Sequence, residues 1–244
     1  MPDHYYDSQR AASEYLLLHY GDQEPWRLPF PARCVTGCLA VDLLPEGARA
    51  LDLGCAVGGG SFELARHCAQ VIGIDASKSF IALARRLRER GSCRFKSCVE
   101  GELMRTRRAV VPREIDRKRA SFEVGDAVRL RGDLGMFDVV MMANLIDRVP
   151  APRRLLEQLP SLLKRGGQLI ITSPYTWMAQ YTPRAQWLGG FERGGRRVQT
   201  FAALKGILSP YFKLSQRRNI PFLIREHARK FQLGIAEASV WLRR

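Results

Sequence analysis

A strand-like run that ends in an acid and passes into a glycine-rich turn constrains this chain more than any other stretch. Residues 49–60 read RALDLGCAVGGG, and a helical pattern follows over residues 61–67. Glycine and alanine let a backbone approach a bound ligand closely, and the start of the following helix offers free N–H groups. The stretch therefore predicts a strand, a ligand-binding loop and a helix, in that order.

Later runs repeat this arrangement of an apolar strand that ends in a polar side chain. The run at 70–74 leads into Asp75, about 20 residues beyond the first loop, where nucleotide-binding sheets place a carboxylate on a ribose diol. The run at 120–127 contains Asp126, and a fourth run ends in Asn144. Because ligands bind outside the carboxyl ends of parallel strands, these side chains are expected around one ligand crevice.

The chain alternates short apolar runs with amphipathic helical stretches. Strands are predicted near 49–53, 70–74, 121–125, 136–142, 167–173, 212–217 and 237–242, and helices near 32–44, 59–68, 77–90, 153–164 and 200–208. Such alternation predicts the α/β class, with a Rossmann-like, doubly wound and mostly parallel sheet of seven strands. Pro160 predicts either a kink in its helix or a later start of that helix.

The 244 residues are expected to form a single domain with four parts. These are N-terminal lid helices at 1–45, a ligand-binding core at 46–175, a basic insertion at 92–120 within that core, and a substrate-side loop with the C-terminal strands at 176–244. Asp7 or Ser8 is expected to cap the first lid helix. The insertion holds seven lysines and arginines between residues 105 and 119, and we expect a short helix and a mobile loop there.

The net charge of +15 is the one unusual feature of the composition. It suits an anionic partner such as RNA, but a run of like charges is more often a solvated face, so a nucleic-acid partner is not expected. No apolar run is long enough to span a membrane, and the N-terminus lacks the pattern of a signal peptide. Six cysteines without a C-x-x-C pair, and only four histidines, predict no metal site and a reduced, cytoplasmic protein.

The glycine loop and the acids after it resemble the S-adenosyl-L-methionine pocket of class I methyltransferases. In that family the glycine turn passes under the methionine part of the cofactor, the second-strand acid holds the ribose and the third-strand acid reaches the adenine amine. The resemblance implies this cofactor, the product S-adenosyl-L-homocysteine, and a binding set of Asp52, Gly54, Cys55, Ala56, Gly58, Asp75, Ala76, Ser77, Gly125, Asp126, Ala127, Asn144 and Leu145. The loop fits the G-x-G-x-x-G spacing of dehydrogenases poorly, which counts against an oxidoreductase.

The flanks of the chain carry a narrower resemblance. Blocks at 5–21, 182–190 and 221–241 together resemble the 5-thiohistidine (4-mercaptohistidine) N-methyltransferase family of ovothiol biosynthesis. The resemblance covers nearly the whole chain, although the basic cluster at 105–119 has no match in it. It implies methylation of the imidazole π-nitrogen of 5-thiohistidine, an amino acid, to give ovothiol A. The family also occurs fused to sulfoxide synthases, so the synthase that supplies the thiol is a candidate partner.

Three residues are the candidates for the catalytic step of such a reaction. Asp147 is a candidate ring acceptor or base, with a helix cap or an ion pair with Arg148 as the alternative. Asn144 is a candidate orienting group near cofactor and ring, and Tyr6 could donate to the ring or its sulfur. The alternative functions are an RNA or other small-molecule methyltransferase and a non-catalytic relative that keeps the fold.

A second set of residues is expected to contact the substrate. An amino acid needs a partner for its carboxylate, and the planar guanidinium of arginine suits that task. The candidates are Arg10, Arg225 and Arg229 for the carboxylate, with Tyr5 from the lid and Tyr175 and Trp177 as stacking walls. Surface exposure of the arginines, and burial of the aromatic residues in the core, are the competing explanations.

Overall fold

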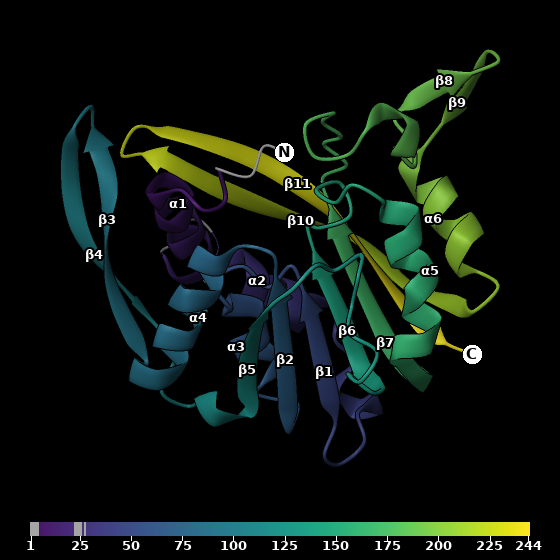
Figure 1. Ribbon diagram of the computed structural model, residues 1–244, viewed down its shortest axis with the longest axis horizontal. Coiled ribbons are helices and arrows are strands. Elements are labelled where there is room, and N and C mark those ends of the chain that lie inside the picture. Colours follow the sequence, from purple (N-terminus) through teal and green to yellow (C-terminus); the bar gives the residue numbers. More distant parts are fainter. Residues whose placement is uncertain (1–4, 22–25, 27) are drawn as a thin grey trace.

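A seven-stranded sheet forms the centre of the computed structural model, which describes residues 5–21, 26 and 28–244. The strands lie in the order β10-β11-β7-β6-β1-β2-β5 (Figure 1). Their bounds are β1 (Arg49–Leu53), β2 (Gln70–Asp75), β5 (Ala120–Val124), β6 (Phe137–Ala143), β7 (Leu163–Ser173), β10 (Phe212–His227) and β11 (Lys230–Arg243). The first five pair in parallel and β11 is antiparallel to both its neighbours. The predicted α/β class and mostly parallel sheet are thus confirmed.

Helices cover both faces of this sheet, as the doubly wound prediction requires. One face packs against α1 (Gln9–Tyr20), α2 (Phe30–Cys38), α3 (Gly59–Leu64) and α4 (Lys78–Arg90), and the other against α5 (Pro152–Leu162) and α6 (Thr200–Leu208). Strand β6 is buried from Phe137 to Met142, because a parallel strand between two helical layers presents apolar side chains on both sides. No helix in the described part of the chain is long and apolar enough to cross a membrane.

The helix termini follow their sequence signals, with two exceptions. Ser8 and Ser77 cap α1 and α4 by accepting from backbone N–H groups, and Gly91 ends α4 with a left-handed φ of 70°. The helix predicted at 32–44 instead stops at Cys38, since the backbone of Ala40 exchanges two hydrogen bonds with the Gln168 side chain. Pro160 does not delay α5, which begins eight residues earlier, at Pro152.

Most of the basic insertion is a two-stranded ribbon where a loop was expected, and the expected short helix is limited to one turn of 3-10 helix. Strands β3 (Ser92–Glu100) and β4 (Leu103–Val110) pair antiparallel around a turn at Gly101, and a 3-10 turn, η2 (Arg117–Arg119), follows. The arginines of β4 lie across the ribbon, where Arg108 Nε donates to Ser92 Oγ at 3.1 Å. Ser13 Oγ of α1 donates to Lys96 O at 2.7 Å, which ties the ribbon to the N-terminal helix.

The two C-terminal strands extend well beyond their predicted ends. Residues 237–242 of β11 are the part paired with β7, and they coincide with the predicted strand. Beyond them β10 and β11 continue as a two-stranded arm that runs over α1 and α2 towards the β3–β4 ribbon (Figure 1). Ala228 N donates to Val99 O at 3.2 Å where arm and ribbon meet. A small hairpin, β8 (Phe191–Arg193) with β9 (Arg196–Val198), was not predicted.

Candidate active site

The glycine loop after β1 takes a left-handed path across the end of β2. Gly54, Ala56 and Gly58 have φ angles of 71°, 47° and 86°, a region that residues with a side chain seldom occupy. The N–H groups of Gly54 and Cys55 donate to Ile74 O at 2.8 and 3.1 Å. The loop is therefore fixed to the neighbouring strand with little side-chain bulk above it, although the Cys55 thiol itself is buried below.

Asp75 ties this loop to the start of α4. Its Oδ2 accepts from Ala56 N and its Oδ1 from Ser77 N, both at 2.9 Å. Burial raises the pKa of the Asp75 carboxyl, while the two backbone donors oppose that rise. Each carboxylate oxygen keeps a further acceptor site, which is what a pair of ribose hydroxyls requires. The neighbouring Ala76 is exposed beside it.

Asp52 lies beneath the loop rather than at its surface. It is 2% exposed and its Oδ2 accepts from Ser61 Oγ at 2.7 Å, so that it joins β1 to α3. Burial raises the pKa of Asp52 to about 7, and the nearby Asp75 carboxylate adds to the rise. Asp52 supports the loop from below and presents no free edge to a ligand.

The turns after β5 and β6 close the same end of the sheet. Gly125 N donates to Asp75 O at 3.0 Å, and the half-exposed Asp126 accepts from Val128 N at 2.8 Å, while Ala127 packs into the core. Asn144 has a left-handed φ of 53°, and its Oδ1 accepts from Thr172 Oγ1 at 3.0 Å. The Leu145 side chain packs against Gly54. All the residues predicted to bind the cofactor therefore gather at the carboxyl ends of four adjacent strands.

The N-terminal segment covers this loop directly. Tyr20 Oη donates to Val57 O at 2.8 Å, and Gly59 N donates to His19 Nδ1 at 3.1 Å. Burial lowers the pKa of His19 to about 3, so the imidazole is a neutral acceptor at physiological pH. At the other end of α1, Asp7 Oδ1 accepts from Ser77 Oγ at 2.8 Å, and this bond holds the residues before α1 against the start of α4.

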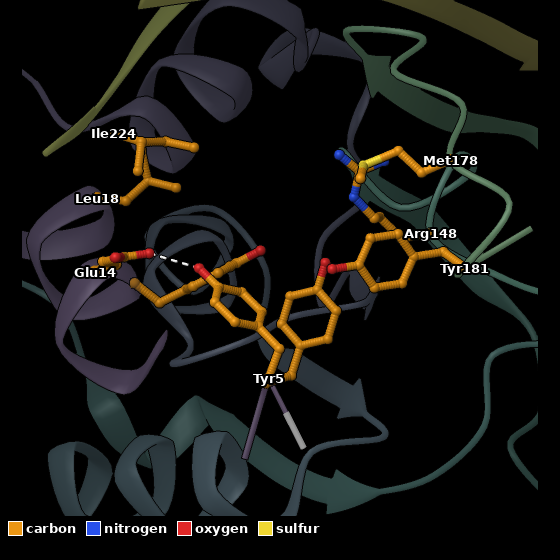
Figure 2. A pocket seen from close by; sticks show the side chains of 9 residues that line it. Tyr5, Glu14, Leu18, Arg148, Met178, Tyr181 and Ile224 are labelled. Atoms are coloured by element: carbon orange, nitrogen blue, oxygen red, sulfur yellow. Dashed lines mark hydrogen bonds between the residues drawn. The ribbon is translucent and has the colours of Figure 1, made fainter. Parts of the chain in front are cut away.

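A cavity of about 200 Å³ lies between this segment and the loops of the sheet. Figure 2 shows the side chains that line it, which are Tyr5, Tyr6, Glu14, Tyr15, Leu18, Arg148, Met178, Tyr181 and Ile224. They come from the N-terminal segment, from the turn after β6, from the loop after β7 and from the β10 arm. The ring of Tyr15 lies 5.9 Å, centre to centre, from that of His19, which accepts from Gly59 N, so the cavity adjoins the cofactor loop.

Asp147 does not reach this cavity. Its side chain is fully buried, with Oδ1 accepting from Ser173 Oγ at 2.9 Å and Oδ2 from Arg148 Nη1 at 2.7 Å and Thr176 N at 3.1 Å. Burial raises the pKa of the Asp147 carboxyl, and Arg148 opposes the rise. The geometry favours the ion pair over a base or ring acceptor, and Arg148 is the residue that faces the cavity.

Only some of the other residues predicted to contact the substrate lie at the cavity. Tyr5 and Tyr6 line the cavity, whereas the Arg10 side chain is 69% exposed and pairs with Glu14 and Glu226. Arg225 lies 4.8 Å from the ring centre of Phe231 on the arm. Arg229 is exposed at the tip of that arm. Neither lines the cavity, because the arm extends past the sheet and presents Ile224 there instead.

The two predicted stacking walls are engaged elsewhere. Tyr175 Oη donates to Glu237 Oε1 at 2.7 Å. Trp177 stacks on Trp187 with its Nε1 donating to Thr200 Oγ1 at 2.9 Å. The same loop supplies Met178 and Tyr181 to the cavity, so the loop was correctly identified but its contacting residues were not.

Glu14 and Arg148 are the charged cavity residues that sequence reasoning missed. One signal was available for Glu14: it lies between Ala11 and Leu18 at the spacing of the buried face of a helix, where an acidic side chain is unusual. Arg148 carried no such signal, because Asp147, one residue closer to the end of β6, has the opposite charge and an equally plausible position.

Comparison with protein families gives one match over the sheet core. A family described as a methyltransferase domain matches residues 51–171, from β1 to β7. A ubiquinone biosynthesis O-methyltransferase of Coxiella burnetii is 27% identical over 128 residues, which cover 52% of this chain and 44% of the relative. The chain thus spans about half the length of the curated relatives it matches.

Two solved structures align over 99% of this chain and 95% of their own. They are the (4+2)-cyclase SpnF, at 16% identity and a TM-score of 0.60, and magnesium protoporphyrin IX methyltransferase from Synechocystis with bound S-adenosylmethionine, at 17% identity and 0.55. At these identities the likeness shows the fold alone. The described residues fit that cofactor, since the loop is low in side-chain bulk and carboxylates lie where hydroxyls and an amine need acceptors.

Proposed function

We propose that this chain, which has the class I methyltransferase fold, is an S-adenosylmethionine-dependent methyltransferase whose acceptor is 5-thiohistidine and whose product is ovothiol A. The observation that carries the proposal is the cavity beside the cofactor loop. It is small, at about 200 Å³, has four tyrosines in its wall and contains one acid and one arginine. Such a lining suits a compact, polar ring compound, which agrees with the resemblance carried by the flanks of the chain.

The proposed cofactor contacts follow the loops at the strand ends. Asp75 would accept from the ribose hydroxyls, Asp126 from the adenine amine, and the turn from Gly54 to Gly58 would lie under the methionine part. Bound there, S-adenosylmethionine supplies an electrophilic methyl group. The contribution of the chain is to hold the acceptor in line with that group and to keep water away, and such alignment supplies a large part of the acceleration.

The cavity tyrosines act as hydrogen-bond donors rather than bases in this proposal. Burial raises the pKa of Tyr6 and Tyr15, so both phenols stay protonated at neutral pH. They can donate to a thiolate on the ring and so stabilise this ionised, nucleophilic form of the substrate. When the ring enters as a thiolate with its proton on the τ-nitrogen, the π-nitrogen has a free lone pair, and no proton has to leave as the N–C bond forms. A buried base is then unnecessary, in agreement with Asp147 lying outside the cavity.

The curated relatives favour a second candidate, O-methylation of a hydroxyl acceptor of ubiquinone biosynthesis. A hydroxyl acceptor needs a base to take its proton. Glu14 is the one carboxylate that lines the cavity among the described residues, and it already accepts from Tyr5 and Arg10. This arrangement supports the thiohistidine proposal over the hydroxyl acceptor.

The test is methyl transfer from labelled S-adenosylmethionine to 5-thiohistidine, with histidine, a ubiquinone-type phenol and bulk RNA as parallel acceptors. Mass and NMR spectra locate the methyl group. We expect one product, methylated at the π-nitrogen of thiohistidine. Label on the phenol would favour the second candidate, and label on RNA would favour a nucleic-acid methyltransferase.

A further inference from the structure

Two side chains of opposite charge line the cavity from different parts of the chain. Glu14 belongs to α1, and Arg148 belongs to the turn after β6. In Figure 2 they lie on opposite sides of the pocket, with tyrosine side chains between them. They form no ion pair with each other in the described structure; each is held by partners of its own.

Glu14 is buried without a buried cation beside it. It is 7% exposed, with Oε2 accepting from Tyr5 Oη at 2.6 Å and Oε1 from Arg10 Nε at 2.9 Å. Arg10 is 69% exposed and is shared with Glu226, so it compensates the buried carboxylate weakly. A carboxylate accepts about four hydrogen bonds, which leaves Glu14 able to bind a cation that enters the cavity.

Arg148 is fixed at one end and free at the other. In the described part of the chain its hydrogen bonds all come from Nη1, to Asp147 O, Asp147 Oδ2 and Thr176 O at 2.7–2.9 Å. Its guanidinium lies 5.1 Å from the ring centre of Tyr181. The remaining N–H donors, on Nε and Nη2, are therefore held in a fixed orientation and can bind a carboxylate in the two-bonded manner typical of arginine.

We propose that Glu14 binds the α-ammonium group and Arg148 the α-carboxylate of a free amino-acid acceptor. This inference rests on the proposed function and assigns the ends of the substrate to residues of this chain. The ring then lies among Tyr6, Tyr15 and Tyr181, next to the cofactor loop. A peptide-linked histidine, whose ammonium and carboxylate are both replaced by amides, is excluded by the same two residues.

The test compares three acceptors that differ only at the charged ends: 5-thiohistidine, its analogue without the amine, and its analogue without the carboxylate. Glu14→Gln should lower kcat/KM for 5-thiohistidine roughly 10- to 100-fold, the usual effect of a lost charged hydrogen bond, and barely change it for the analogue without the amine. Arg148→Met should likewise lower kcat/KM for 5-thiohistidine and barely change it for the analogue without the carboxylate. Glu157→Gln and Arg165→Met, at exposed positions away from the cavity, are the matched controls, and both should leave kcat/KM for all three acceptors unchanged.

A purely structural role would give a different pattern. If Glu14→Gln lowered kcat/KM for all three acceptors by the same factor while the wild type still produced ovothiol A, the assignment would be wrong and the proposed function would stand. If the wild type methylated none of the three, calorimetry with histidine, histamine and imidazolepropionate in the presence of S-adenosylhomocysteine decides the assignment separately. Tighter binding of histidine than of both analogues, lost in the two variants, supports it; equal or absent binding overturns it.

Discussion

Gly54 is the position where backbone conformation and packing constrain the cofactor loop together. Its φ is +71°, and an added Cβ would lie 2.7 Å from Leu145 Cδ1. Gly47 has the same φ of +71° but nothing within 4 Å of an added Cβ. Alanine at either site costs about 1–2 kcal/mol in backbone strain. The comparison of the two sites therefore isolates the packing against Leu145.

We expect Gly54→Ala to lose more unfolding free energy than Gly47→Ala and to weaken S-adenosylmethionine binding, because the loop must move away from Leu145. Denaturant unfolding and calorimetric titration measure the two effects. Gly47→Ala should bind the cofactor as tightly as the wild type. Equal losses of stability and unchanged affinity in Gly54→Ala would show that the loop adapts without cost.

Asp75→Asn tests the acid at the end of β2. Asparagine offers a single acceptor oxygen where Asp75 now accepts from both Ala56 N and Ser77 N. We expect a 10- to 100-fold weaker affinity for S-adenosylmethionine, roughly the value of one or two charge-assisted hydrogen bonds. Asp133→Asn, at an exposed acid beyond the β5 turn, should leave the affinity unchanged. An unchanged affinity in Asp75→Asn would remove Asp75 from the cofactor site.

Sequence reasoning located the acids of the cofactor loop and two cavity tyrosines, Tyr5 and Tyr6, but not the charged side chains of the cavity. Asp75 and Asp126 were found because each follows its own strand, and position along a strand is a local property. Glu14 and Arg148 come together only when α1 folds over the sheet, and that contact leaves no spacing in the sequence. Asp147 and Arg148 are adjacent, and which one faces the cavity depends on Ser173 at the end of β7 and on Thr176 in the loop after it.

At the scale of elements, α1 is attached to the glycine loop by a histidine that stays neutral. His19 accepts from Gly59 N, and burial lowers its pKa from 6.5 to about 3. The unfolded chain binds a proton below pH 6.5 and the folded chain does not, so stability present above pH 6.5 is lost as the pH falls towards 3. Between these two pH values the free energy of unfolding changes by up to about 1.4 kcal/mol per pH unit.

His19→Asn should remove this dependence, because its amide oxygen can accept from Gly59 N without titrating. We expect the unfolding free energy of the variant to fall less steeply than that of the wild type between pH 6.5 and 4. Urea unfolding at several pH values measures both slopes, and His67→Asn provides the histidine control outside α1. Parallel slopes for the wild type and His19→Asn would contradict a buried, neutral His19.

Elements whose apolar residues recur at a fixed spacing could be predicted from the sequence. Elements held mainly by pairing between two strands could not. The helices and parallel strands of the sheet have apolar positions at fixed spacing, because each buries a face against the core. The β3–β4 ribbon buries little, so its sequence shows charge without alternation of apolar residues. In the outer half of the β10–β11 arm, residues 230–236 of β11 pair only with β10, and the sequence pattern placed the ends of both strands at the edge of the sheet.

For the molecule as a whole, the excess of positive charge lies partly on the ribbon and apart from the cavity. Arg94, Arg105 and Arg108 are exposed there, and none of the ribbon residues lines the cavity. A basic surface of this kind binds polyanions by releasing counterions, without recognising them. Binding to RNA and methylation of a small acceptor should therefore be separable in this protein.

The triple variant Arg94→Gln, Arg105→Gln, Arg108→Gln tests that separation. Its affinity for bulk RNA should fall and the logarithmic salt slope should decrease by about 2, since each lost phosphate contact contributes about 0.7 for a single strand. Methyl transfer to 5-thiohistidine should remain at the wild-type rate, with or without RNA, because Glu14, Arg148 and the cofactor loop are untouched. Filter binding over a salt series and the labelled-methyl assay give the two readouts. If the triple variant lost methyl transfer in proportion to RNA binding, the basic ribbon would belong to the reaction, and the acceptor would have to be sought among nucleic acids.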